Sequence, residues 1–149
     1  MHVIAAKAQC FYEALQPEFV EYQKQVITNA KVLAKSLSEE GFKIIAGSTD
    51  NHLLLIDVKS KLGITGKEAE KVLDKINITV NKNTIPNDTE PANKSSGIRL
   101  GTPAMTTRGF KEEEFYKVGK IISKCLNNIE NEEILLELQK EVLELTKNC

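Results

Sequence analysis

A long segment with apolar residues at helical spacing constrains the fold of this chain most strongly. After Pro17, an apolar residue recurs every three or four positions as far as Leu37. This spacing predicts an amphipathic helix that has one buried stripe and ends at Gly41. Other parts of the chain must therefore cover the stripe. It consists of Phe19, Tyr22, Val26, Ala30, Leu33 and Leu37.

The remaining segments predict both helices and strands. Helices are expected over 1–15, after a Thr65–Glu68 capping box, over 111–126 and over 130–147. Strands are expected over 42–46, 52–58, 77–80 and 97–102, and the turn-rich joint between the first two favours an antiparallel pair. The expected fold class is α+β, with a small, mostly antiparallel sheet covered by helices.

Residues 81–96 are rich in Asn, Pro, Ser, Thr and Asp and show no periodicity. A structureless stretch of this length inside a compact domain is unusual, and such loops tend to be functional. This segment is therefore expected to be a long functional loop.

Charge and cysteine content exclude several classes of function. The net charge of −1 produces no long-range field, so neither nucleic acid nor an anionic membrane is an expected partner. Cys10, Cys125 and Cys149 include no CxxC pair, which fits neither a disulfide framework nor a zinc site. We expect free thiols, a cytoplasmic location and no metal.

Catalytic candidates are few. His2 and His52 have no second ligand or nucleophile at motif spacing, and a structural role is expected for both. No serine lies in a GxSxG context, and no glycine-rich loop matches a phosphate-binding or dinucleotide-binding motif.

Two arginines stand out among 20 basic residues, because all the others are lysines. Arg99 and Arg108 lie within one ten-residue window. A guanidinium group is a planar fork that binds a carboxylate through two hydrogen bonds, which lysine cannot do. Arg99 lies between Ile98 and Leu100 in an expected strand, where a buried cation would need a partner. A bound carboxylate and an internal Asp or Glu are both open as that partner.

Several motifs of the chain resemble serine hydroxymethyltransferase in its bacterial form. They are Met1-His-Val-Ile-Ala5, Thr49-Asp-Asn-His-Leu53, Thr65-Gly-Lys-Glu-Ala69, Ile78-Thr-Val-Asn-Lys-Asn-Thr-Ile-Pro-Asn-Asp88, Ser96-Gly-Ile-Arg-Leu-Gly-Thr-Pro-Ala104 and Thr107-Arg-Gly-Phe110. They occur in the order of that family, and the resemblance covers essentially the whole chain.

The resemblance implies a pyridoxal-phosphate enzyme of fold type I that interconverts serine plus tetrahydrofolate with glycine plus methylenetetrahydrofolate. In that family a large domain carries the cofactor lysine in a Thr-rich, His-Lys motif, which is absent here. By resemblance, residues 1–16 are a helix leading from the large domain and residues 17–149 are the C-terminal small domain. The cofactor lysine is then expected upstream of Met1, and an uncapped helical start suits a piece of a longer protein. Full-length relatives are homodimers or tetramers, and this chain alone is expected to be inactive.

The resemblance also assigns a role to Arg99, the binding of the α-carboxylate of the serine or glycine substrate. Cleavage at Cα requires the breaking bond to stand perpendicular to the cofactor ring, and a two-point clamp on the carboxylate sets this angle. Arg108 matches a family arginine near the site, with either a structural or a phosphate-region role. Thr102 and Pro103 are expected to shape the turn behind Arg99.

The loop that begins at Asn81 resembles the folate-contacting segment of the family, with Asn83 as the expected polar contact to the pterin. Bacterial relatives usually have a Ser-Pro-Phe sequence where this chain has Pro91, Ala92 and Asn93. Backbone contacts to folate can survive this change, but a contact from the missing Phe cannot.

Other interpretations remain at this point. An Asn-rich loop can instead satisfy its own backbone groups through its side chains. The chain can also be a free-standing, non-catalytic carboxylate-binding module, or the small domain of another fold-type I enzyme related to aminotransferases.

Overall fold

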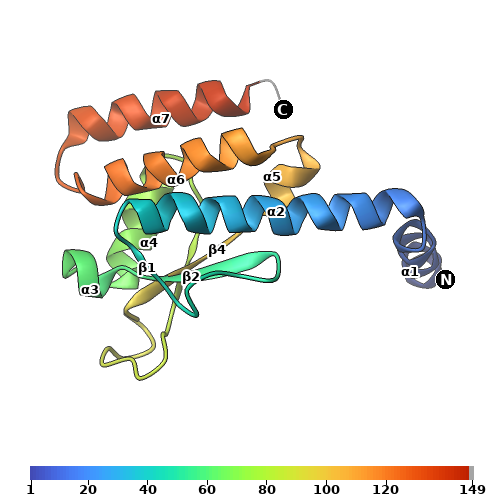
Figure 1. Cartoon of the computed structure of the whole chain (residues 1–149), viewed down its shortest axis with the longest axis horizontal. Helices are drawn as coiled ribbons and strands as arrows, with labels where there is room; N and C mark the ends of the chain where they lie inside the picture. The colour runs from blue at the N-terminus through green and yellow to red at the C-terminus, as the bar shows by residue number, and fades with distance from the viewer. Residues whose placement is uncertain (148–149) are drawn as a thin grey trace.

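In the computed structural model, which describes residues 1–147, four strands form one antiparallel sheet in the order β1-β2-β4-β3 (Figure 1). This confirms the predicted α+β class. The strands are β1 (Lys43–Ile44), β2 (Leu53–Asp57), β3 (Asn81–Asn83) and β4 (Gly97–Gly101). The helices are α1 (His2–Ala14), α2 (Pro17–Glu39), α3 (Lys59–Leu62), α4 (Gly66–Lys75), α5 (Pro103–Thr107), α6 (Glu112–Leu126) and α7 (Glu132–Thr146).

The long helix α2 follows the sequence prediction closely. Its stripe is buried from Val26 to Leu37, whereas Phe19 near its beginning remains 37% exposed. The helix ends at Glu39, and Gly41 adopts a left-handed conformation with φ of 82°. The amides of Gly41 and Phe42 donate to carbonyl groups of the last helical turn, at 2.9 and 3.0 Å. The predicted stop at Gly41 is therefore confirmed as a Schellman motif.

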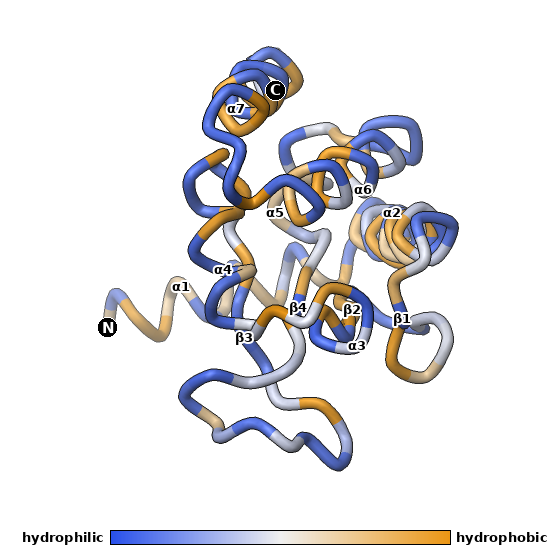
Figure 2. The backbone as a smooth tube through the Cα atoms, turned by 90° about the vertical axis from the view of Figure 1, so that its left-hand side faces the viewer, coloured by the Kyte–Doolittle hydropathy of each residue, from blue (hydrophilic) through white to orange (hydrophobic). Residues whose placement is uncertain are grey.

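The two faces of the sheet have different environments. Leu54, Ile56, Ile98 and Leu100 point to one face and are nearly inaccessible to solvent. Helices α2, α4, α6 and α7 lie over this face, and the long loop after β3 extends on the opposite side (Figures 1 and 2). The hydrophobic core thus lies between the sheet and the helices, while none of the helices within residues 1–147 forms a layer over the second face of the sheet.

The strand predicted over 77–80 is wrong. Helix α4 ends at Lys75, and Asn77 adopts a left-handed conformation with φ of 63°. The amides of Asn77 and Ile78 donate to Asp74 and Leu73 carbonyl oxygens, both at 3.0 Å. The helix thus ends in a second Schellman motif, with Asn in the place usual for Gly, and the strand begins only at Asn81.

Other boundaries differ by a few residues. Strand β1 covers only two of the five predicted residues, because Ala46 and Gly47 take left-handed conformations. Helices α3 and α5 were not predicted, since four or five residues are too few to show a helical period. Helix α7 begins at Glu132 rather than at 130, because the Asn131 side chain accepts a hydrogen bond from the Ile134 amide.

Helix α1 forms as predicted but covers no part of the core. It projects from the N-terminal end of α2 at the edge of the molecule (Figure 1). Each of its large apolar side chains is more than half exposed. These side chains are Val3, Ile4, Phe11 and Tyr12. Within residues 1–147, no helix is both long and apolar enough to span a membrane.

Of the cysteines, Cys10 on α1 is exposed and Cys125 on α6 is buried, and neither forms a disulfide. Burial raises the pKa of the Cys125 thiol to about 11, so this group is an unreactive part of the core. Cys149 lies outside the described residues.

Candidate functional site

Arg99 lies at the centre of β4 on the face of the sheet that carries no helix layer. Its side chain is exposed, and its strand neighbours are Leu55 on β2 and Asn81 on β3. The expectation that Arg99 is a buried cation is therefore wrong, because its side chain points away from the face that the helices cover. Within residues 1–147, Arg99 forms no ion pair with Asp or Glu, so an internal carboxylate does not occupy its guanidinium group.

Asn81 is the nearest polar neighbour of Arg99 and was missed from the sequence. The guanidinium Nη2 donates to the Asn81 Oδ1 atom across a long distance of 3.5 Å. The sequence placed Asn81 at the beginning of a loop, although it pairs with Arg99 as the first residue of β3. The Asn-Lys-Asn alternation at 81–83 was a possible signal, because strand residues two apart share a face.

Asn83 lies two residues along β3, on the same face as Asn81 and Arg99. It pairs with Gly97 in the register of the sheet, and its side chain is half-buried. Its amide group donates a hydrogen bond to the Thr84 carbonyl oxygen at 2.7 Å. The three side chains thus place a cation and two carboxamides along the end of the sheet where the long loop begins.

The loop of residues 84–96 has no regular secondary structure, but it is an ordered turn system. The expected structureless segment was 81–96, and its first three residues are instead β3. Pro91, Ala92 and Asn93 are exposed, and the amides of Lys94 and Ser95 turn back to donate to the Pro91 carbonyl oxygen. Figure 2 shows the loop on the side of the sheet opposite α2, α6 and α7. Arg99 and this loop therefore belong to the same helix-free side of the molecule.

Asp88 organises this loop, and the sequence analysis did not single it out. Its Oδ2 atom accepts hydrogen bonds from the Ile85 and Ser96 amides, at 3.1 and 2.9 Å. Its Oδ1 atom accepts from the Glu90 amide at 2.9 Å and from the Ser96 hydroxyl at 2.5 Å. Partial burial alone would raise the pKa of Asp88, but these four hydrogen bonds outweigh it and hold the pKa well below its usual range.

Thr102 directly follows β4 in the chain and is completely buried. Its hydroxyl donates to the Val26 carbonyl oxygen of α2 at 2.8 Å, and its own carbonyl oxygen accepts from the Thr106 hydroxyl at 2.8 Å. Pro103 begins α5 at the next position. Thr102 therefore joins the end of the Arg99 strand to α2 and has no access to a ligand.

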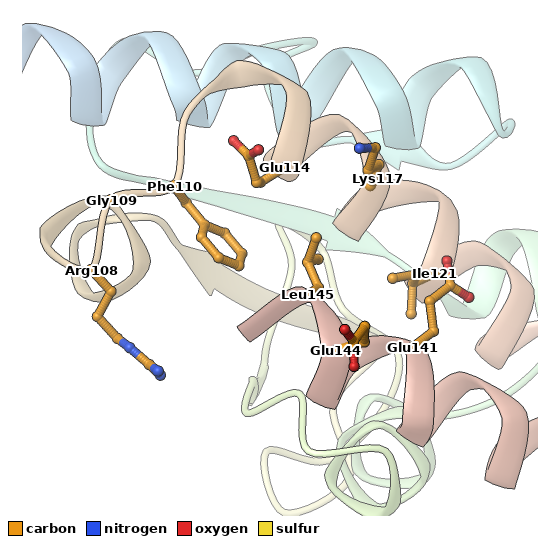
Figure 3. Close-up of a pocket in the computed structure, with 9 residues that line it drawn as sticks. All are labelled: Arg108, Gly109, Phe110, Glu114, Lys117, Ile121, Glu141, Glu144 and Leu145. Carbon is orange, nitrogen blue, oxygen red and sulfur yellow. The ribbon is translucent and has the colours of Figure 1, made fainter. Parts of the chain in front are cut away.

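The second arginine lies in a different region. Arg108 follows α5 and lines a cavity of about 550 Å³ near the end of α7 (Figure 3). Its Nη2 atom donates to the Thr146 carbonyl oxygen at 3.3 Å. The other charged residues around the cavity are Lys117, Glu114, Glu141 and Glu144. Arg99 does not line this cavity, so the two arginines that are close in sequence do not form one site.

The histidines add nothing to this arrangement. Both His2 and His52 are exposed, and the His52 carbonyl oxygen accepts from the Thr102 amide at 3.0 Å. Among residues 1–147, no cluster of three or more His, Cys, Asp or Glu side chains is arranged to hold a metal ion.

The sequence of the region that contains this site matches a known protein family. The sequence model of the serine hydroxymethyltransferase family matches residues 1–122. The match includes both arginines, β3 and the whole of the loop at 84–96.

Proposed function

The chain belongs to the serine hydroxymethyltransferase family, and on that premise we propose that it forms the C-terminal part of a pyridoxal-phosphate enzyme. The enzyme would interconvert serine plus tetrahydrofolate with glycine plus methylenetetrahydrofolate. The observation that carries the proposal is the exposed guanidinium group of Arg99 on the helix-free face of the sheet. That group lies on the same side of the sheet as the loop that resembles the folate segment.

Arg99 binds the α-carboxylate of the amino acid in this proposal. The strand holds its backbone on both sides, through β2 and β3, so the guanidinium group projects from a rigid base. Asn81 lies at its side and limits the directions that the fork can take. A fork fixed in this way can hold a carboxylate through two hydrogen bonds and set the orientation of the Cα bonds.

Folate binds to Asn83 and to the turn formed by Pro91, Ala92 and Asn93. The side-chain Nδ2 atom of Asn83 donates a hydrogen bond to the Thr84 carbonyl oxygen. Its Oδ1 atom can accept a hydrogen bond from the pterin. The turn offers exposed backbone and one carboxamide but no aromatic ring. We therefore expect polar contacts to dominate the contribution of this chain to folate binding.

Pyridoxal phosphate binds mainly to a large domain encoded upstream. When bound, the cofactor supplies an electron sink for the pair released at Cα. In this chain the two histidines precede Val3 and Leu53, so it contains no His-Lys motif. The cavity beside Arg108 does not fit a phosphate, because three glutamates surround it against two cations. We therefore assign a structural role to Arg108, with its guanidinium group bound to the end of α7.

The division of the chain follows the break between α1 and α2. Residues 1–16 lead from the large domain, and residues 17–149 form the small domain. The exposed apolar side chains of α1 support this division, because a surface of this kind normally contacts another part of the protein. As in the family, we expect the complete protein to be a cytoplasmic homodimer or tetramer.

The test is to replace Arg99 by Lys in the complete protein, with its large domain and bound cofactor. Lysine keeps the charge but loses the fork, so kcat/KM for serine should fall roughly 10- to 150-fold, equivalent to about 1.5–3 kcal/mol. Arg108→Lys is the matched control, because it is the same change at the only other arginine. It should leave kcat/KM within about twofold.

Two results would contradict the proposal. One is an equal loss of activity in both variants, which would indicate a general structural effect. The other is tight binding of glycine or serine by the 149-residue chain alone, measured by calorimetry. That outcome would favour a free-standing carboxylate-binding module, because the enzyme needs the cofactor to supply the remaining contacts.

A further inference from the structure

Backbone hydrogen bonds attach the loop of residues 84–96 to the rest of the molecule at three carbonyl oxygens near its end. The Ser96 carbonyl oxygen accepts from the amides of Val58 and Lys59, at 3.1 and 3.2 Å, where β2 continues into α3. The carbonyl oxygens of Ser95 and Lys94 accept from Gly66 and Lys67 at the beginning of α4. These bonds hold the end of the loop but leave its first half and its turn to be held by other contacts.

The Lys59 side chain of α3 forms an ion pair with Glu90 in the middle of the loop, and Asp88 supplies the contacts that connect the two halves. Ile85 lies at the beginning of the loop, Glu90 in the middle and Ser96 at the end, and all three donate to the one carboxylate. Ser96 is buried, so the carboxylate joins the exposed turn to a fixed point of the core. An ionised carboxylate has two oxygen atoms that can each accept two hydrogen bonds, which no neutral side chain of this size can match.

The side chain of Ile85 adds a steric constraint at the same place. A Cβ atom at Gly97 would lie 2.6 Å from the Ile85 Cγ2 atom, so the beginning of the loop packs directly on β4. Gly97 lies two residues before Arg99 on that strand. The Asp88 network thus sets the distance between the turn at 91–93 and the strand that carries Arg99.

We propose that Asp88 is a positioning residue for folate: it holds the turn of Pro91–Asn93 and the backbone after Asn83 in the geometry that binds the pterin. This inference rests on the proposed function. Asp88 touches neither substrate in this arrangement. Its effect passes through the loop, and it should therefore change folate binding and leave the amino-acid site at Arg99 intact.

The experiment compares Asp88→Asn with the wild type in the complete protein, by measuring KM separately for tetrahydrofolate and for serine. Asparagine has the same size, but its side-chain NH2 group cannot accept the hydrogen bonds that backbone N–H groups donate to the carboxylate oxygen of Asp88. We expect KM for tetrahydrofolate to rise roughly tenfold to hundredfold, because misplacement by about 1 Å has effects of that order. KM for serine should change by less than about twofold. Asp74→Asn, on the exposed surface of α4, is the matched control and should change neither value.

Hydrogen exchange in the 149-residue chain provides the second measurement. The amides of Ile85, Glu90 and Ser96 should lose protection in Asp88→Asn, while amides of α2 and α6 keep it. Unchanged protection at these three amides would overturn the inference, and so would a parallel rise of both KM values. If the wild-type protein does not use tetrahydrofolate at all, the proposed function fails and the folate role of Asp88 fails with it. Loss of protection in that case would identify Asp88 as an organiser of the loop only, which distinguishes the two failures.

Discussion

The two faces of the sheet are made from the same strands but have opposite roles. Leu54 and Leu55 are neighbours on β2, yet Leu54 packs under the helices and Leu55 points to the side of Arg99. On the helix side the sheet contributes apolar side chains that are nearly inaccessible to solvent. On the other side it presents a cation, two carboxamides and a loop held by a carboxylate.

This difference separates stability from binding within a few residues. Burial of apolar area stabilises the fold, and nearly all of that burial lies between the sheet and α2, α4, α6 and α7. The polar face can therefore keep exposed groups for ligands, since we expect those groups to contribute little to stability. Substitutions on the two faces should change different properties. Leu54→Ala on the helix-covered face should destabilise the fold most and Arg99→Ala on the other face least, with Thr65→Ala at the beginning of α4 between them.

The largest effect should come from replacing Leu54 by Ala. The side chain is 2% exposed in the centre of the core, so its removal should lower the free energy of unfolding by about 2–5 kcal/mol. The matched variant Leu55→Ala removes the same atoms one residue further along, from a half-buried position. It should cost about 1 kcal/mol, in line with partial burial. Urea denaturation of both variants measures the difference, and equal losses would show that the two faces are equally important for stability.

A smaller effect should come from Thr65→Ala at the beginning of α4. Thr65 and Glu68 form the predicted capping box, in which each side chain accepts a hydrogen bond from the backbone amide of the other. Loss of the Thr65 hydroxyl should cost about 0.5–2 kcal/mol at pH 7.

The same variant has a pH dependence of known sign. Hydrogen bonds from the backbone amide and hydroxyl of Thr65 hold the pKa of Glu68 below its usual range. A carboxylate with a lowered pKa stabilises the fold above its unfolded pKa, and this contribution is lost as the pH falls through the folded pKa. The wild type and Thr65→Ala should therefore differ less in unfolding free energy at pH 3 than at pH 7. A constant difference across this range would contradict a role for the Glu68 charge.

The smallest effect on stability should come from Arg99→Ala. The side chain is exposed and its hydrogen bond to Asn81 is at the limit of hydrogen-bond length, so the free energy of unfolding should change by no more than about 0.5 kcal/mol. Thermal or urea unfolding of the 149-residue chain is the measurement. A loss comparable to that of Leu54→Ala would mean that Arg99 is a structural residue and would sharply weaken its assignment to carboxylate binding.

Prediction from the sequence succeeded where the relevant signal is local. The helical stripe of α2, the stop at Gly41 and the capping box at Thr65 each depend on residues within a few positions of one another. It failed at 77–80, where Asn77 ends a helix in a conformation more usual for Gly, and apolar residues that follow such a turn look like a strand. The assignment of ligand roles to Arg99, Asn83 and the turn at 91–93 stays a prediction.

The sequence by itself determined the fold class, most of the helices, the family and the two arginines as candidate site residues. Each of these follows from residue types and their short-range spacing, because helix periodicity, capping and motif order are properties of neighbouring residues. Only the tertiary structure decided that Arg99 is exposed, that Arg108 lies in a separate cavity, and that Asp88 joins the two halves of the loop. These facts depend on strand register and on which face the helices cover, and both arise from contacts between residues far apart in the chain.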